Sequence, residues 1–409
     1  MKTNALSLSL MAALFAAIMI SSCSKDHDLV LQDVTSQPDA KLLKSGMVEA
    51  VMLTPMEELG KNIYFDKISV PNSMACADCH APMSGFTGPM PGINLHGAVY
   101  RGADAQNFGN RKPPSAAYAT FSPVFYFDAE EGLFIGGNFW DGRATGERLG
   151  SPTAEQALGP FLNPAEHNVP DKLTVLKKIA KAKYAGMWET VWGEPLMYDT
   201  PEQIESNYDR VGLSIAAFEG SAEVNQFTSK FDYYLKGMVE LTPEEAWGMA
   251  LFNDEEKGKC ALCHISEGDQ PLFTDFTFDN LGTPINPENP VYDYDPDFID
   301  PGLGGFLATR DDYMDMAAGN WGKHKVPTLR NVDKRPGNGF PKAYMHNGVF
   351  KSLKEVVHFY NTRDVESWPP PEVPENVNQE ELGNLGLTDA EEDAIVAFMM
   401  TLSDGYKIK

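Results

Sequence analysis

The sequence predicts a mainly helical fold made of two tandem units, and three observations predict it. The motif C-x-x-C-H occurs twice, at Cys76–His80 and at Cys260–His264. Each copy follows a segment with the start signals of a helix, at Thr54 and at Thr242. The chain lacks the sustained alternation of apolar and polar residues that is typical of strands.

Each C-x-x-C-H motif is the attachment signature of a c-type haem. Two thiols add to the vinyl groups of one haem, and the adjoining histidine binds the iron from the same side. Paired C-x-x-C motifs also suit tetrahedral zinc, but a zinc site does not need a histidine directly after both pairs. We therefore predict two covalently bound haems c, held by Cys76, Cys79, His80, Cys260, Cys263 and His264.

The segments before the two motifs repeat one pattern. Threonine, proline and glutamate stand at the N-cap, first and third positions of a helix, and glycine follows six residues after the threonine, at Gly60 and Gly248. A helix that leads into C-x-x-C-H is typical of a cytochrome c domain. We predict two cytochrome c-like domains with long loops, at residues 44–238 and 239–409.

The same capping signals predict three further helices, which begin after Thr200, Ser352 and Thr388. The last helix has an apolar face and should pack against the first helix of its domain. Two proline-rich stretches, Pro284–Pro301 and Pro369–Pro374, predict loops.

The N-terminus resembles a bacterial lipoprotein signal peptide over residues 1–22. Lys2 precedes an apolar run that is too short for a comfortable membrane span, and small residues lead into Cys23. Cys23 would then carry the lipid and residues 23–43 would form a tether; the alternative is an ordinary signal peptide that leaves Cys23 as a spare thiol. We expect a lipid-anchored protein on the periplasmic side of a bacterial envelope.

The formal net charge of −25 restricts the partners. An acidic surface argues against nucleic acid and would steer a basic redox protein favourably. Solubility alone is the simpler explanation of the same charge.

The order of motifs over Leu53–Leu402 resembles the bacterial di-haem cytochrome c peroxidase family, which includes MauG-like members. The motifs are both C-x-x-C-H sites, Phe139–Ala144, Gln156-x-x-Gly159-Pro160, Asn163-Pro164-x-Glu166, Val326–Asn331 and Tyr344–Gly348. The resemblance implies that peroxide reacts at the N-terminal haem and that the C-terminal haem stores and passes electrons.

The resemblance also implies roles for individual residues. Glu166 would move a proton between the peroxide oxygens and Gln156 would position them, while Trp140 would lie between the haems. Arg143 and Arg330 could pair with haem propionates, because a guanidinium binds a carboxylate through two hydrogen bonds. Without the resemblance, Glu166 would be interpreted as a helix-start or surface acid and Trp140 as a core residue. The two arginines would be interpreted as members of surface ion pairs.

Two axial positions separate the peroxidases from MauG-like members. In the peroxidases a histidine in the loop of His96 binds the N-terminal iron until reduction releases it, whereas MauG-like members keep that position open. On the second haem the family position corresponds to Tyr360, where peroxidases have methionine and MauG-like proteins tyrosine; His358 and Met345 are alternatives. Methionine favours ferrous iron and tyrosinate favours ferric iron.

Calcium between the domains is usual in the family, bound by carbonyls and one asparagine. The nearby segments are Asn110–Pro113 and Pro341–Ala343, but Lys112 stands at or near the expected asparagine. Dimers are common in the family, so a homodimer is an expectation by analogy.

We therefore expect an exported di-haem peroxidase that reduces hydrogen peroxide to water with electrons from a small donor, a cytochrome c or a cupredoxin. The alternatives are a MauG-like oxidase that uses peroxide-derived high-valent iron on another substrate, and a non-catalytic electron-transfer cytochrome. Glu166 and Gln156 argue against the last, because electron transfer needs no distal acid–base group.

Overall fold

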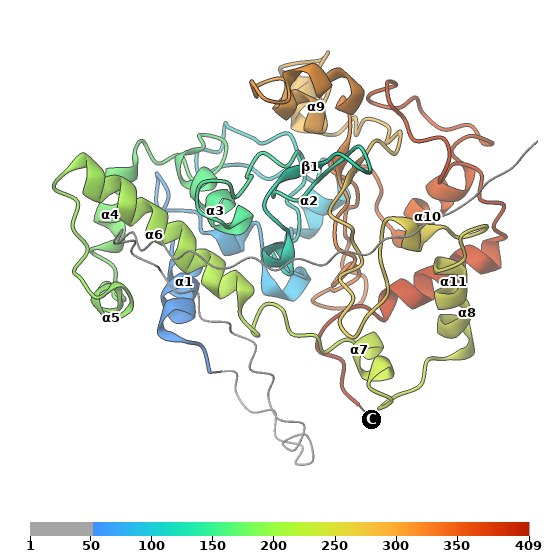
Figure 1. Ribbon diagram of the computed structural model, residues 1–409, viewed down its shortest axis with the longest axis horizontal. Coiled ribbons are helices and arrows are strands. Elements are labelled where there is room, and N and C mark those ends of the chain that lie inside the picture. The colour runs from blue at the N-terminus through green and yellow to red at the C-terminus, as the bar shows by residue number, and fades with distance from the viewer. Residues whose placement is uncertain (1–51, 409) are drawn as a thin grey trace, which may run out of the picture. The chain divides into compact units, whose positions relative to one another are not determined.

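The computed structural model describes residues 52–408, which belong to one compact unit (Figure 1). The predicted signal peptide, the tether and Cys23 lie outside the described residues. Helices dominate, as predicted. The helices are α1 (Pro55–Phe65), α2 (Pro91–Leu95), α3 (Pro152–Leu162), α4 (Lys172–Ile179), α5 (Met187–Trp192), α6 (Pro201–Gly220), α7 (Lys230–Leu235), α8 (Pro243–Phe252), α9 (Gly302–Leu307), α10 (Leu353–Thr362) and α11 (Asp389–Met400).

The capping signals gave the correct starts of five helices. In α1, α6, α8, α10 and α11 the N-cap hydroxyl accepts a hydrogen bond from the third helical N–H, and the acidic or amide side chain at that position bonds back to the N-cap N–H. This reciprocal bonding satisfies donors that a helix start otherwise leaves free. The N-caps are Thr54, Thr200, Thr242, Ser352 and Thr388.

Two separate apolar cores match the two copies of the repeat. The first is formed mainly by α1, α3, α4 and α6, and the second by α8, α10 and α11. The last helix, α11, packs against α8 as predicted, and Figure 1 shows the two side by side. The boundary placed near residue 238 stays a prediction.

The repeated glycines lie where the paired helices come closest. A Cβ on Gly60 would lie 1.8 Å from the carbonyl oxygen of Ser214 in α6, and a Cβ on Gly248 would lie 1.8 Å from that of Ala394 in α11. Only glycine allows the backbones to approach this closely.

In the described part of the chain, four short strands form two antiparallel pairs, which the sequence did not predict. β1 (Tyr126–Asp128) pairs with β2 (Leu133–Ile135), and β3 (Phe278–Asp279) pairs with β4 (His324–Lys325). A third apolar cluster joins β2 and β3 to α9 through Phe134, Phe278 and Leu303. Within residues 52–408, none of the helices has both the length and the apolar content required to cross a membrane.

We predict that Gly248→Ala destabilises the protein by about 1–3 kcal/mol or more, because α8 and α11 must separate to admit the methyl group. Gly92→Ala is the matched control, since a Cβ there meets nothing within 4 Å. Urea unfolding of both variants measures the difference. Equal stability of the two variants would contradict this account of the helix contact.

Candidate functional site

One continuous cavity reaches both C-x-x-C-H motifs. Its lining includes His80 and His264, together with Glu166, Gln156 and Tyr360. Residues that are far apart in the sequence therefore face the same space.

Each motif forms one short turn of 3₁₀ helix, at Cys76–Asp78 and at Cys260–Leu262. The N–H of the motif histidine donates to the carbonyl of the first cysteine at 2.9 Å in both copies, so the two motifs share one backbone turn. The four cysteines are in no disulfide.

Both motif imidazoles are held in one orientation. His80 Nδ1 lies 3.2 Å from the carbonyl oxygen of Phe86, and His264 Nδ1 lies 2.8 Å from that of Phe273. Burial lowers the pKa of each histidine to about 4, so the neutral form prevails. A neutral ring that donates from Nδ1 keeps its Nε2 lone pair for a metal.

The two accepting phenylalanines share an uncommon backbone conformation. Phe86 has φ 57° and Phe273 has φ 54°, the left-handed region that bulky residues rarely adopt. This conformation aims the carbonyl at the imidazole. Strain of this kind persists where a site demands it.

The donor groups fit covalent haem better than zinc. Among residues 52–408, the thiols and imidazoles of the motifs do not gather closely enough for one tetrahedral ion. Moreover, the buried Nη2 of Arg330, a residue that also lines the cavity, has no hydrogen-bond partner within the described part of the chain. A haem carboxylate is the kind of acceptor that this nitrogen lacks.

The distal residues predicted for the first site lie together. Gln156 is on α3, and Asn163 ends that helix. The Asn163 amide donates to a Glu166 carboxylate oxygen at 2.7 Å. Burial raises the pKa of Glu166, while Asn163 and Arg143 oppose that shift. A carboxyl with a raised pKa takes up a proton more readily than an ordinary one and can return it.

Trp140 is buried and fixed from two directions. Its indole N–H donates to the carbonyl of Lys112 at 2.8 Å, and its own carbonyl accepts from the N–H of Lys325 at 2.8 Å. The ring lines the cavity. The structure thus places Trp140 at the shared space, and its position between two haems stays a prediction.

The two predicted arginines have protein partners. Arg143 is half-exposed, pairs with Asp141 at 2.7 Å and lies over the ring of Phe139. Arg330 is fully buried, and its Nη1 contacts both carboxylate oxygens of Asp232 at 2.8 Å. Arg330 is therefore not the surface ion pair that was the alternative, whereas the exposed Arg143 still fits that alternative.

His96 lies away from the cavity. Its side chain is 67% exposed, and Nδ1 lies 3.0 Å from a carboxylate oxygen of Glu288. His96 is not part of the cavity lining. In this arrangement the residue predicted as a releasable ligand does not face the site around His80.

Two of the three candidates for the second distal ligand line the cavity, and the third does not. Tyr360 and Met345 both line the cavity. His358 instead pairs with Glu392 at 2.9 Å and with Glu366 at 3.4 Å. Burial raises the pKa of Tyr360, and the neighbouring Cys263 and Asp279 add to that shift. Tyr360 is therefore next to the second motif.

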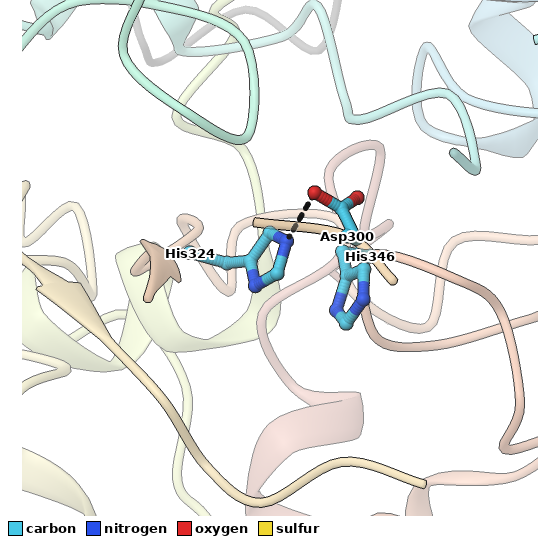
Figure 2. Close-up of side chains that lie close together, drawn as sticks. All are labelled: Asp300, His324 and His346. Atoms are coloured by element: carbon cyan, nitrogen blue, oxygen red, sulfur yellow. Dashed lines mark ion pairs between the residues drawn. The ribbon is translucent and has the colours of Figure 1, made fainter. Parts of the chain in front are cut away.

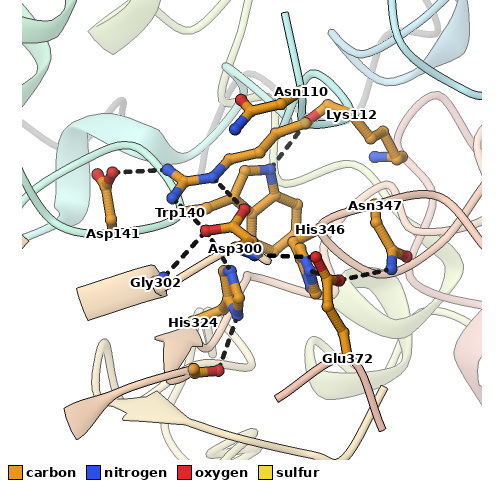
Figure 3. A network of polar contacts seen from close by, with 12 residues as sticks. Asn110, Lys112, Trp140, Asp141, Asp300, Gly302, His324, His346, Asn347 and Glu372 are labelled. Atoms are coloured by element: carbon orange, nitrogen blue, oxygen red, sulfur yellow. Dashed lines mark hydrogen bonds and ion pairs between the residues drawn. The ribbon is translucent and has the colours of Figure 1, made fainter. Parts of the chain in front are cut away.

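A buried polar network that the sequence did not reveal surrounds Trp140 (Figure 3). Arg111 binds both carboxylate oxygens of Asp300 at 2.6 Å and also reaches Asp141. His324 lies 3.4 Å from Asp300, and His346 lies 3.2 Å from Glu372. Asp300 lies in a proline-rich loop and is 189 positions from Arg111 in the sequence. A local sequence pattern therefore could not predict that the two residues pair.

Asp300, His324 and His346 have ligand atoms within 4.8 Å of one another, but they do not suit one metal ion (Figure 2). The imidazole rings stack with centroids 3.6 Å apart and planes only 9° from parallel. Because each lone pair lies in its ring plane, the two cannot converge on one ion. Arg111 already neutralises the carboxylate.

The segments expected to bind calcium also fit poorly. The ammonium of Lys342 donates to the carbonyls of Ser84, Asn331 and Lys334 at 3.0–3.3 Å. Lys112 donates to Thr87 and to its neighbour Pro113. The carbonyls near these segments therefore serve lysine cations.

Known proteins resemble the chain over most of its length. A family model described as di-haem cytochrome c peroxidase matches residues 54–240. The methylamine utilization protein MauG of Paracoccus denitrificans (strain Pd 1222) is 34% identical over 366 residues, 85% of this chain and 88% of that protein. The cytochrome-c peroxidase IdrP2 of Denitromonas iodatirespirans is 26% identical, over 91% of this chain and 85% of that protein. The crystal structure of the diheme peroxidase BthA from Burkholderia thailandensis E264 aligns with TM-score 0.72 and 29% identity, over 87% of each chain.

We predict that Arg111→Gln costs about 3–5 kcal/mol, because the buried carboxylate of Asp300 loses its arginine partner and Asp141 keeps only Arg143. Arg148→Gln, which breaks an exposed pair with Asp209, should cost about 1 kcal/mol or less. Unfolding free energies at pH 7 measure both.

The same variant should respond to pH. Arg111 holds the pKa of Asp300 well below its ordinary value despite burial. The ion pair therefore stabilises the wild type fully at pH values above the ordinary pKa of an aspartate, and this stabilisation is lost as the pH falls toward the lowered pKa. Without Arg111, burial raises the pKa, and protonation relieves the penalty. The stability gap between wild type and variant should narrow as pH falls from about 7 to about 4; a constant gap would contradict the charge argument.

Proposed function

Because the chain belongs to the di-haem cytochrome c peroxidase family, we propose that it reduces hydrogen peroxide to water at the site around His80. Members of this family carry two c-type haems. Each haem, when bound, supplies an iron that exchanges electrons. Two electrons and two protons convert each peroxide into two waters, and the electrons come from a redox partner through the site around His264.

The observation that carries this proposal is the Glu166 carboxyl. It lines the same cavity as His80, Asn163 holds it at 2.7 Å, and burial raises its pKa. Glu166 accepts the proton of one peroxide oxygen and delivers it to the other, which leaves as water. Gln156, on α3 beside it, orients the peroxide with its amide.

A MauG-like oxidase is the second candidate, and Tyr360 favours it. Tyr360, like Met345, faces the cavity at the position where the family distinguishes its two branches. The position of His96 points the same way, because a site without this ligand needs no prior reduction. The MauG of Paracoccus denitrificans is also the relative with 34% identity.

We also propose that Cys23 carries a lipid that anchors the protein at the periplasmic side of the envelope. The lipobox-like residues before Cys23 support this. The net charge of −25 supports a basic donor, a small cytochrome c or cupredoxin.

Peroxide titration of the fully oxidised and the half-reduced protein separates the candidates. Turnover only after one-electron reduction supports a gated peroxidase, with His96 moving to the iron in the oxidised state. A long-lived spectral change from the fully oxidised protein supports the MauG-like branch. No reaction in either form would leave an electron-transfer protein.

We predict that Glu166→Gln slows peroxide consumption by about 10²–10⁴-fold, because the amide cannot accept a proton. Both haems should remain bound, as a pyridine haemochrome assay checks. Glu189→Gln, an exposed change on α5, is the control and should keep wild-type rates. An unchanged rate in Glu166→Gln would remove this residue from the proposed reaction.

We predict that Tyr360→Phe changes the ferric absorption and electron paramagnetic resonance spectra of the second haem and raises its reduction potential, because a ligand that favours ferric iron is lost. His358→Gln should leave both properties unchanged, since His358 pairs with Glu392 and Glu366. The reverse pattern would identify His358 as the ligand, and no change in either variant would leave Met345.

A further inference from the structure

Lys342 places a positive charge between the two halves of the chain. The residue is 4% exposed. Its ammonium donates to the carbonyl of Ser84, four residues after His80, at 3.0 Å. It also donates to the carbonyls of Asn331 at 3.3 Å and Lys334 at 3.0 Å. One cation therefore ties the loop of the first motif to a segment about 250 residues away.

The geometry requires the protonated form of Lys342. Three acceptors surround one nitrogen, and only an ammonium has three N–H donors. A neutral amine would turn its lone pair toward a carbonyl oxygen. Although burial and then the charge of Lys112 lower the pKa of Lys342 to about 7, the three carbonyls hold the charged form.

The positive side chains around the Lys342 ammonium would repel a calcium ion. Lys112, Arg335 and Lys334 bring positive charge toward Lys342, and only the Asp333 carboxylate acts in the opposite direction. Asp333 is itself paired with Arg335 at 2.7 Å. A calcium ion needs six to eight oxygen ligands, and the positive charges of these side chains would repel it.

The asparagine and carbonyl groups near Lys342 already form hydrogen bonds with other protein groups. Asn94 donates from its amide nitrogen to the carbonyls of Gly88 at 2.9 Å and Pro341 at 3.0 Å. The carbonyl of Asn110 accepts from the side chain of Asn289 at 2.8 Å. One carbonyl in each of the segments expected to bind calcium, that of Pro341 and that of Asn110, therefore already accepts a hydrogen bond from an asparagine side chain.

We propose that the ammonium of Lys342, with Lys112 beside it, takes the place of a structural calcium ion, so that the folded protein neither contains nor needs calcium. In this proposal the side-chain ammonium supplies the positive charge that a calcium ion would otherwise supply. It gathers carbonyl oxygens from both halves around one positive charge.

Metal content and unfolding of the haem-loaded wild-type protein test this proposal without using enzyme activity. We expect substoichiometric calcium by elemental analysis and the same melting temperature with and without EGTA. Calorimetric titration should show no saturable calcium binding up to about 1 mM, the weak end of protein calcium sites. One tightly bound calcium per chain, or a melting temperature that falls with EGTA, would overturn the proposal.

A pair of variants tests the lysine itself. Lys342→Met keeps the length of the side chain and removes the charge, so its melting temperature should fall by about 5 °C or more. Lys183→Met changes an exposed lysine and should leave it unchanged. Equal melting temperatures in the two variants would contradict the proposal. If Lys342→Met does not fold, the wild-type calcium measurements decide alone, and loss of peroxide activity in any variant bears only on the proposed function.

Discussion

The orientation of the two motif imidazoles is the constraint on which the rest of the structure depends. Each ring must be neutral and must donate from Nδ1, so that Nε2 keeps its lone pair for iron. Phe86 and Phe273 provide the accepting carbonyls, and both adopt a left-handed backbone to do so. Such strain needs a rigid surrounding. Phe86 belongs to the apolar core of the helices that meet at Gly60, and Phe273 belongs to the core of the helices that meet at Gly248.

Charged groups inside the protein fix the two halves relative to each other. Arg111 reaches Asp300 across 189 positions, and Lys342 reaches Ser84 across 258. Buried ion pairs add little net stability, because desolvation offsets the attraction. Their effect is on specificity, since a shifted arrangement would leave a buried charge unpaired. The electron transfer proposed between the two sites would have the same requirement, because its rate depends on a fixed distance between them.

The features that the sequence predicted are those with local causes. The caps at Thr54 and Thr242 and both C-x-x-C-H turns depend on residues a few positions apart, and all formed as expected. Partners from distant segments could not be predicted. The pairing of Arg330 with Asp232 and of His96 with Glu288 depends on loop paths that no periodicity encodes. The family resemblance predicted Glu166 near His80, but it could not show that the ammonium groups of Lys112 and Lys342 contact the backbone carbonyls of several segments.

The two sites have the same arrangement around the motif histidine but different residues on the distal side. This difference would set the direction in which electrons flow between them. Glu166 is a carboxyl that can exchange a proton without leaving the cavity. Tyr360 is a phenol whose ionised form burial and Asp279 both disfavour. A phenolate in such a place needs a cation in direct contact. If Tyr360 binds iron, the charge that stabilises the phenolate is the ferric ion itself, and the bond in turn stabilises the ferric state. The site around His264 would then release electrons readily, and the site around His80 would be where peroxide accepts them.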